Sequence, residues 1–334
     1  MDQQLLVKTN SEIIMDYLTL EFGNYFCEEK SHVSGYYFPL KSQRFDKLKF
    51  PSDGKIVWDK KKGTVFYKDG KYFGIYHNGL VKGIYNSKTN TVLNLIRDPS
   101  RYFNICVGVI DYLFSKFLLH RNIFRIHAAC VVRNNEGLLI CGSKGAGKTT
   151  LLMKLLQSGY SFVADDSVYL QFKDNKLICY PFPKSIKISA IDTKKFPNLY
   201  QNLKYHRIIT SDGLEKLIIK PQENAFPVET QRFSISQIII PTIAPQQSCE
   251  KNIIHPTIPK TQCCAIDVIK NKLSYDLLIR SFRGDDLLNI DYLPNSTLLK
   301  AQKDLCQKVL DLYNIKIFTL GNNFEEIQIG DFLS

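Results

Sequence analysis

The sequence predicts an α/β fold in which a smaller β-rich domain, residues 1–97, precedes an α/β domain, residues 98–334. Three observations support this prediction. The chain of 334 residues is longer than a single hydrophobic core usually serves. Hairpin signals are frequent before residue 97. An apolar run, a glycine-rich loop and a helical pattern follow one another directly over residues 137–157.

Short strands separated by tight turns account for most of residues 1–97. Asp-Gly at 69–70 and Asn-Gly at 78–79 lie between runs of aromatic and β-branched residues. Both dipeptides tolerate the positive φ that two-residue hairpin turns need, and residues 86–90 offer a third turn. We therefore expect an antiparallel meander, preceded by a short helix near residues 12–22. This domain is a candidate for substrate docking.

Strands and helices alternate in the second domain. A helix is expected to begin at residues 98–100, and the apolar runs FRIHAACVV and GLLICG that follow predict buried strands. After the glycine-rich loop come a helix, TTLLMKLLQSG, a strand, SFVADD, and a hairpin that turns at residues 174–175. Further on, the pattern predicts a strand in QRFSISQIIIPTI, a helix over about 297–313 and a strand in IKIFTL.

The formal net charge of +12 is spread along the chain, and its densest basic run holds only three lysines. A diffuse excess favours anionic ligands such as nucleotides or acidic peptides. It differs from the concentrated stripe of a protein that binds duplex nucleic acid. We therefore expect no nucleic-acid partner.

The cysteines and the apolar segments predict a cytoplasmic protein without membrane association. The nine cysteines form no C-x-x-C pair and no Cys/His metal spacing, so reduced thiols are expected. The N-terminus lacks the basic and apolar regions of a secretory signal. The most apolar stretch, FNICVGVIDYLFSKFLL, is interrupted by Asp111 and Lys116 and is too short to span a bilayer.

The segment GSKGAGKT fits the phosphate-loop pattern G-x-x-x-x-G-K-[ST] at every fixed position. Its glycines let the backbone curl so that N–H groups surround phosphate oxygens, and the helix that follows adds its positive end. Lys148 would neutralise charge on the transferred phosphate, and the Thr149 hydroxyl would bind Mg²⁺. The strand before and the helix after the loop argue against a chance glycine turn. The predicted nucleotide-binding residues are Gly142, Ser143, Lys144, Gly145, Ala146, Gly147, Lys148, Thr149 and Thr150.

Asp165 and Asp166 end an apolar strand only one helix after the loop. This short separation is typical of small kinases, whereas motor and transporter ATPases usually place longer insertions here. Two aspartates allow two functions, one beside the metal and one that accepts the proton of an attacking hydroxyl. The alternative is a single magnesium site with a spare, solvated carboxylate.

His127 lies on the apolar run before the motif strand, where a lone histidine is more often a hydrogen-bonded core residue than a functional one. A cation that stabilises the transferred phosphoryl group is also needed, although each candidate is more often a surface charge. These candidates are Arg232, Arg283, Lys184 and Lys187.

Taken together, His127, the loop GSKGAGKT, a helix ending in SGY and the strand FVADD resemble the catalytic domain of bacterial HPr kinase/phosphorylase and the wider HPr-kinase-like kinases. The resemblance runs from about 124 to 188 and includes YPFPKSIKIS. It implies an HPr-kinase-like P-loop domain that uses ATP and Mg²⁺, and a homo-oligomer. It also implies that Asp165 is the general base toward a serine, that Asp166 helps to hold Mg²⁺, and that His127 positions or tunes the base, with Lys148 in its P-loop role.

The sequence also departs from that enzyme. Its Arg-Gly-rich signature is missing, FRGDDLLNID at 282–291 being only a faint echo, and residues 1–97 do not resemble its regulatory domain. We therefore expect a kinase that phosphorylates a serine of another peptide or protein, for example a ribosomally made precursor, rather than HPr. One alternative is a small-molecule kinase that acts on free serine or a sugar. Another is a nucleotide-sensing module in which the aspartates only hold magnesium.

Overall fold

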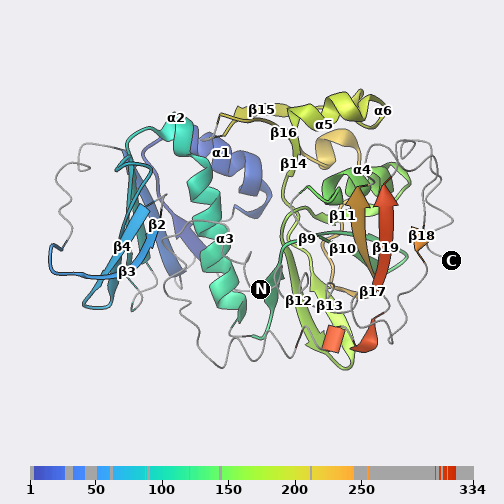
Figure 1. Ribbon diagram of the computed structural model, residues 1–334, viewed down its shortest axis with the longest axis horizontal. Coiled ribbons are helices and arrows are strands. Elements are labelled where there is room, and N and C mark those ends of the chain that lie inside the picture. Colours follow the sequence, from blue (N-terminus) through green and yellow to red (C-terminus); the bar gives the residue numbers. More distant parts are fainter. Residues whose placement is uncertain are drawn as a thin grey trace. The chain divides into compact units, whose positions relative to one another are not determined.

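A computed structural model describes most of the first 243 residues and several near the C-terminus. The described residues are 4–26, 33–41, 51–60, 63–86, 88, 91–119, 121–142, 145–210, 213–243, 254–255, 305, 308–309, 311–313 and 315–320. The chain divides into two compact units, which we call the N-terminal unit, mainly residues up to Leu118, and the P-loop unit, mainly residues from Leu119. Figure 1 shows the helices and strands of both, with labels on most of them.

The N-terminal unit contains a seven-stranded sheet in the order β1-β2-β7-β6-β5-β4-β3. Its strands are β1 (Gln4–Val7), β2 (Val33–Lys41), β3 (Lys55–Lys60), β4 (Gly63–Lys68), β5 (Lys71–Tyr76), β6 (Val81–Asn86) and β7 (Thr91–Ile96). Strands β3 to β7 form the predicted antiparallel meander, and residues at the turns 69–70 and 77–79 have positive φ. β2 adds in parallel to β7, and β1 to β2, pairings between distant segments that local turn signals do not indicate.

Helices α1 (Glu12–Phe22), α2 (Pro99–Tyr102) and most of α3 (Asn104–Leu119) belong to the same unit. The contacts thus divide the chain after Leu118, whereas the sequence predicts a boundary after residue 97. Aromatic packing explains the difference, because the ring centroids of Tyr17 and Phe103 are 4.4 Å apart and those of His77 and Tyr102 are 4.8 Å apart. No helix in the described ranges is long and apolar enough to cross a membrane.

The P-loop unit is built on a nine-stranded sheet whose main path is β11-β9-β10-β17-β13-β12-β8. Its strands are β8 (Phe124–Ile126), β9 (Ala128–Arg133), β10 (Glu136–Cys141), β11 (Ser161–Ala164), β12 (Val168–Lys173), β13 (Lys176–Tyr180), β17 (Phe233–Ile243), β18 (Ile254–His255) and β19 (Ile315–Leu320). β17 runs parallel to both β10 and β19, and the other pairs are antiparallel. The mixed α/β class predicted from the sequence is therefore confirmed.

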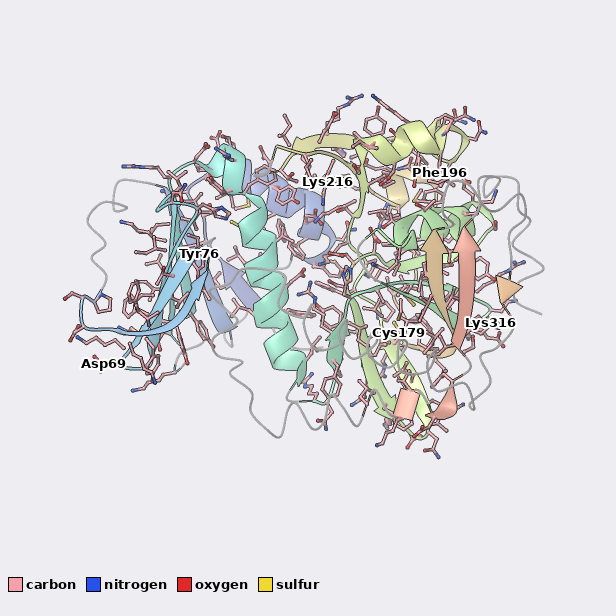
Figure 2. The ribbon with its side chains drawn as sticks, in the orientation of Figure 1. Asp69, Tyr76, Cys179, Phe196, Lys216 and Lys316 are labelled. Atoms are coloured by element: carbon pink, nitrogen blue, oxygen red, sulfur yellow. The ribbon has the colours of Figure 1, made fainter. Side chains whose placement is uncertain are left out.

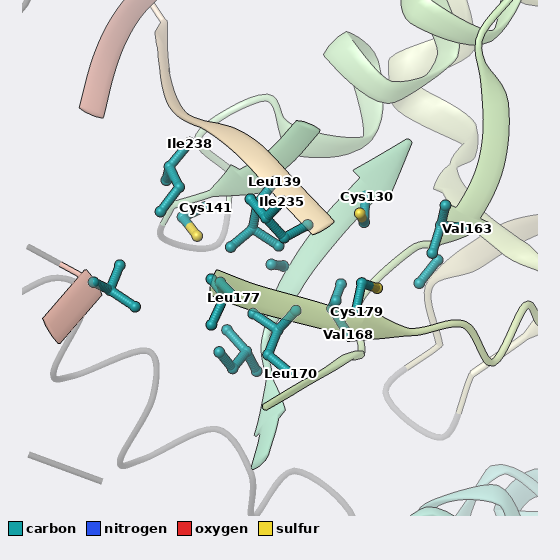
Figure 3. Close-up of a cluster of buried hydrophobic side chains, with 14 of the residues drawn as sticks. Cys130, Leu139, Cys141, Val163, Val168, Leu170, Leu177, Cys179, Ile235 and Ile238 are labelled. Carbon is teal, nitrogen blue, oxygen red and sulfur yellow. The ribbon is translucent and has the colours of Figure 1, made fainter. Parts of the chain in front are cut away.

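Apolar side chains of β9 and β10 alternate between two cores, because successive residues of a strand point to opposite faces of the sheet. Ala129 and Ile140 pack with the buried face of α4 (Lys148–Gln157). Cys130, Leu139 and Cys141 pack in the other core, which Figure 3 shows. The sheet is buried on both sides, which is why these strands read as continuous apolar runs.

A small antiparallel sheet, β14 (Ile186–Ser189), β16 (Glu215–Ile219) and β15 (His206–Ile209), packs against α4. Helices α5 (Ala190–Lys195) and α6 (Pro197–Tyr200) follow β14, and Phe196 between them packs on the same core (Figure 2). Of the helix expected over about 297–313, the described residues 305, 308–309 and 311–312 are helical. Arg283 lies outside the described residues.

Candidate active site

The glycine-rich loop joins β10 to α4, in the strand–loop–helix order that the motif requires. Gly145 and Gly147 have φ values of 81° and 94°, a left-handed conformation that residues with a Cβ adopt only at a cost. A Cβ added at Gly145 would meet no atom within 4 Å. Backbone conformation, rather than space, therefore requires glycine there. Ser143 and Lys144, two of the predicted nucleotide contacts, lie outside the described residues.

Lys148 bends back from the start of α4 across the loop. Its Nζ donates a hydrogen bond of 2.9 Å to the carbonyl oxygen of Gly142, and the residue is buried. The ammonium is thus held beside the curled backbone where phosphates bind in loops of this pattern. Thr149 and Thr150 follow on the first turn of the helix, and Thr150 is buried.

Asp165 links the first turn of α4 to β14 through both carboxylate oxygens. Oδ1 accepts a hydrogen bond of 3.1 Å from the Thr149 hydroxyl, and Oδ2 accepts one of 3.2 Å from the backbone N–H of Lys187. Burial, followed by the charge of Asp166, raises the pKa of Asp165 to about 6, although the hydrogen bonds and Lys148 act against this shift. This pKa lies much closer to neutral pH than that of an ordinary aspartate.

A break in an antiparallel ladder brings His127 near the aspartates. β8 pairs with β12 through Ile126 and Val168, and β9 pairs with β11 through Cys130 and Ala164. Between these two pairs the ladder is interrupted, so residues 127–129 lie opposite residues 165–167. Such an interruption releases side chains and backbone groups from strand pairing and can aim them into a site.

His127 contacts Asp166 rather than Asp165. Its Nδ1 lies 2.8 Å from Oδ1 of Asp166 and 3.1 Å from the carbonyl oxygen of the same residue. Asp166 has a φ of 73°, a conformation that few residues with a Cβ adopt and that aspartate tolerates better than most. His127 therefore does not contact the expected base, Asp165. The flanking pairs place residue 127 opposite residue 167, and the contact with Asp166 arises where the ladder is interrupted and the backbone of Asp166 is left-handed.

The electrostatic surroundings of Asp166 differ from those of Asp165. Partial loss of solvent around the carboxylate acts to raise the pKa of Asp166, but the hydrogen bond and charge of His127, with the charges of Arg125 and Lys187, outweigh it and hold the pKa below its ordinary range. The side chain is also 56% exposed, so solvent screens these charges in part. The pKa values of the two adjacent carboxyl groups are therefore shifted in opposite directions, up for Asp165 and down for Asp166.

Arg125 and Ser167 form a part of the site that the sequence interpretation missed. The buried guanidinium donates two hydrogen bonds to the Ser167 hydroxyl, from Nε at 2.9 Å and from Nη2 at 2.7 Å. Arg125 thereby fixes the residue that follows Asp166 and places a positive charge beside it. The sequence does contain a signal for this contact. Arg125 is a charged residue inside the apolar run FRIH, and a charged residue is rarely buried without a partner.

The side chains predicted to stabilise the transferred phosphoryl group have different surroundings in the structure. Arg232 lies with its guanidinium carbon 5.7 Å from the ring centre of Tyr180, and Lys184 has its Nζ 5.9 Å from the ring centre of Phe182. Lys187 reaches Asp165 through its backbone N–H. The positive charge of Lys187 also helps to lower the pKa of Asp166, so Lys187 is the candidate whose charge lies near the carboxylates.

The residues present fit a magnesium ion bound together with a nucleotide. Mg²⁺ prefers oxygen ligands in an octahedron, whose neighbouring corners are about 3 Å apart for bonds of roughly 2.1 Å. The Thr149 hydroxyl and the Asp165 carboxylate are 3.1 Å apart. In the described part of the chain, no three His, Cys, Asp or Glu side chains gather as a metal cluster. Phosphate oxygens and water would complete the coordination, as is usual for Mg²⁺.

One sequence comparison supports the resemblance that the motifs indicate. The sequence matches no protein-family model. HPr kinase/phosphorylase of Chlorobium limicola is 31% identical over 70 residues, which are 21% of this chain and 20% of that protein. The match thus spans about a fifth of that relative's length. The structure of the HPr(Ser) kinase/phosphatase from Coxiella burnetii is 20% identical, over 39% of this chain and 75% of that chain, with a TM-score of 0.23.

Proposed function

We propose that this chain, an HPr-kinase-like protein, is a kinase that transfers the γ-phosphoryl group of ATP to a hydroxyl, with serine of a peptide or protein as the acceptor. The observation that carries the proposal is the 3.1 Å contact between Thr149 of the phosphate loop and Asp165. This contact joins the predicted nucleotide-binding loop to a buried carboxyl group whose pKa is raised to about 6. A carboxylate with a pKa near the working pH is suited to accept a proton during transfer.

Each part of the site has a task in this reaction. The loop N–H groups and the start of α4 would hold the phosphates. Lys148, bent back over the loop, would neutralise the charge that spreads over the transferred group. Bound Mg²⁺ would offset further phosphate charge. Asp165 would take the proton of the acceptor hydroxyl, and His127 would keep Asp166 in place.

The geometry also supports a second assignment of the two aspartates. Because Asp165 touches Thr149, it is well placed to bind Mg²⁺ itself, whereas the resemblance gives that task to Asp166. In that case Asp166, which is more than half exposed and held by His127, would face the acceptor. The proposed reaction is the same, but the base and the metal ligand are exchanged.

A peptide or protein acceptor is favoured by the net charge of +12, because diffuse positive charge attracts acidic chains. Docking on residues 1–97, a cytoplasmic location and a homo-oligomer belong to the same proposal. A small-molecule kinase is the main alternative. Deletion of residues 1–118, which removes residues 1–97 together with the helices that pack on them, separates the two, since loss of peptide modification with an unchanged small acceptor would indicate a docking domain.

Radiolabelled ATP provides the direct test. The purified chain, with Mg²⁺ and a library of serine peptides, should transfer label to serine peptides and not to the same peptides with alanine in place of serine. Asp165→Asn should still bind ATP and should lose transfer by at least about 10²-fold, the smallest usual contribution of a general base. Label that stays on ATP or appears only on free phosphate would support a nucleotide sensor, and label on free serine or a sugar would support a small-molecule kinase.

A further inference from the structure

The parallel pair of β10 and β17 contains a bulge near the start of both strands. Gly137 lies opposite Ile235, but Leu138 lies opposite Gln237, so β17 carries one extra residue, Ser236. Bulges are rare between parallel strands, and they often re-aim a side chain beside a site. A hydrogen bond of 3.1 Å, which the Ser236 hydroxyl donates to the carbonyl oxygen of Gly137, holds this bulge against β10.

The extra residue turns two polar side chains to the same face of the sheet. Residues two apart share a face in a regular strand, yet Ile235 and Ile238, which are three apart, lie in the same core. Ser236 and Gln237 therefore both lie on the opposite face, which α4 covers. There they line a cavity of about 200 Å³, together with the buried side chain of Leu138 from the α4 core.

Opposite charges lie at the same cavity, on the turn between β9 and β10. Arg133 and Glu136 are directly opposite one another across this hairpin, and both line the cavity. Opposite charges in such positions usually attract one another, but within the described ranges these two side chains form no ion pair. The guanidinium carbon of Arg133 lies instead 5.6 Å from the ring centre of Tyr160. Neither charge is therefore neutralised by the other.

Tyr160 shows that both charges lie close to one point of the cavity wall. Burial raises the pKa of its hydroxyl, while the charge of Arg133 acts to lower this pKa and the charge of Glu136 acts to raise it. The ring itself is buried in the α4 core. A ligand beside this hydroxyl would thus meet a cation and an anion together.

Gln237 adds an amide whose oxygen has no partner. Its Oε1 is buried and makes no hydrogen bond within the described part of the chain. Buried acceptors without a donor are rare in native proteins. Rotation of this amide toward the cavity would break no hydrogen bond of its oxygen, so the oxygen can accept one from a ligand that carries an N–H group.

These features fit a small zwitterion. Guanidinium binds carboxylate through two parallel hydrogen bonds, and Glu136 attracts an ammonium, whereas a phosphate would be repelled by Glu136 and a simple amine by Arg133. Directly opposite residues have Cα atoms only about 4.5–5.5 Å apart, so one small molecule can reach both charges. The volume is also below the roughly 300–1,000 Å³ of pockets for drug-sized ligands. A free α-amino acid meets these requirements, because one carbon carries both its carboxylate and its ammonium.

We propose that this cavity binds a free α-amino acid with a short polar side chain. Its carboxylate would pair with Arg133 and its ammonium with Glu136, while Ser236 and Gln237 would contact the side chain. At about 3.3 Å per residue, Glu136 at the start of β10 lies roughly 20 Å from Gly142 of the phosphate loop. The site is therefore separate from the candidate active site. The inference goes beyond the proposed kinase function and does not depend on it.

Calorimetric titration of the purified full chain without ATP tests the site. The probe is L-asparagine, whose side-chain amide can donate to Gln237 and which has no hydroxyl to be phosphorylated. Two related molecules each lack one of its charges, succinamic acid the ammonium and 3-aminopropanamide the carboxylate. Each should bind at least about tenfold more weakly than asparagine, because a hydrogen bond to a charged group contributes about this factor or more.

Variants at exposed positions keep the test independent of folding defects. Arg133 and Glu136 are exposed, and Arg133→Gln and Glu136→Gln should each weaken asparagine binding by about tenfold or more. Arg207→Gln is the matched control, because the guanidinium carbon of Arg207 lies 5.4 Å from the ring centre of Tyr205. It removes the same kind of contact elsewhere in the P-loop unit and should bind asparagine as the wild type does.

Several results would overturn the proposal. They are no heat of binding at millimolar asparagine, equally tight binding of either singly charged relative, unchanged binding by both cavity variants, and equal weakening by Arg207→Gln. Displacement of asparagine by a fluorescent ATP analogue would also overturn it, because the amino acid would then lie at the phosphate loop. Each of these results leaves the phosphoryl-transfer proposal standing, since no transfer is measured.

Discussion

The imidazole of His127 holds the carboxylate of Asp166, with Nδ1 2.8 Å from Oδ1, across a break in the ladder between two strand pairs. Replacing His127 by alanine should release Asp166 and lower kcat by about 10²-fold, a loss typical of a misplaced reacting group. The KM for ATP should change little, because the phosphate loop is untouched.

His206 offers a matched control for this substitution. It is an exposed histidine whose Nε2 lies 3.3 Å from Glu223, and His206→Ala should leave kcat for a short serine peptide unchanged. If both variants lower kcat equally, the effect of His127 is not specific to the candidate site.

The two assignments of the aspartates predict different effects on magnesium. If Asp165 binds the metal beside Thr149, Asp165→Asn should raise the Mg²⁺ concentration needed for half-maximal ATP binding by about tenfold or more, since loss of an anionic ligand weakens a site of few protein ligands. If Asp166 is the ligand, Asp166→Asn should have this effect instead. Titration of Mg²⁺ against a fluorescent ATP analogue measures both. If the Mg²⁺ dependence of ATP binding is unchanged in both variants, neither carboxylate binds the metal.

The raised pKa of Asp165 predicts a pH-dependent cost to stability in the absence of metal and nucleotide. The folded chain holds this proton up to about pH 6, whereas an unfolded chain releases it near pH 4. Between these values the folded state binds more protons, so the free energy of unfolding falls as the pH rises. The contribution reaches about 3 kcal/mol, at 1.36 kcal/mol for each pKa unit.

Urea denaturation at pH 4 and at pH 7 checks this sign. Asp165→Asn removes the titrating group. The free energy of unfolding of this variant minus that of the wild type should therefore be larger at pH 7 than at pH 4. A difference between variant and wild type that is the same at both pH values would show that the pKa of Asp165 is not raised on folding.

Arg125 and Ser167 should be energetically coupled. Arg125→Met leaves the Ser167 hydroxyl buried without its two donors, and unsatisfied buried groups cost about 1–3 kcal/mol. A double-mutant cycle with Ser167→Ala, measured by urea denaturation, should give a coupling energy of about 0.5–3 kcal/mol. Additive losses would mean that Arg125 acts through another partner.

Local patterns predicted most elements of the P-loop unit, while the arrangement within the site depended on pairing between distant segments. The loop glycines, the helix at 148–157 and the strands around them follow from periodicity and turn chemistry close in sequence. The partner of His127 does not, because it depends on where the ladder between two distant segments is interrupted and on the left-handed backbone of Asp166 within that interruption. The same limit explains why Arg125, although visible as a charge in an apolar run, could not be linked to Ser167 before the register was known.

A comparison of Gly145 with Gly159 separates an effect on the phosphate loop from the general cost of placing alanine at a left-handed backbone position. Both have left-handed backbones, with φ of 81° and 86°, and an added Cβ would meet no atom within 4 Å at either position. Alanine should therefore cost each a similar conformational penalty, about 1–2 kcal/mol. Only Gly145 belongs to the loop, so Gly145→Ala should weaken binding of a fluorescent ATP analogue by about tenfold or more, as the N–H groups that surround the phosphates shift. Gly159→Ala, beyond the end of α4, should bind the analogue as the wild type does, and equal weakening by both substitutions would count against a phosphate cradle at this loop.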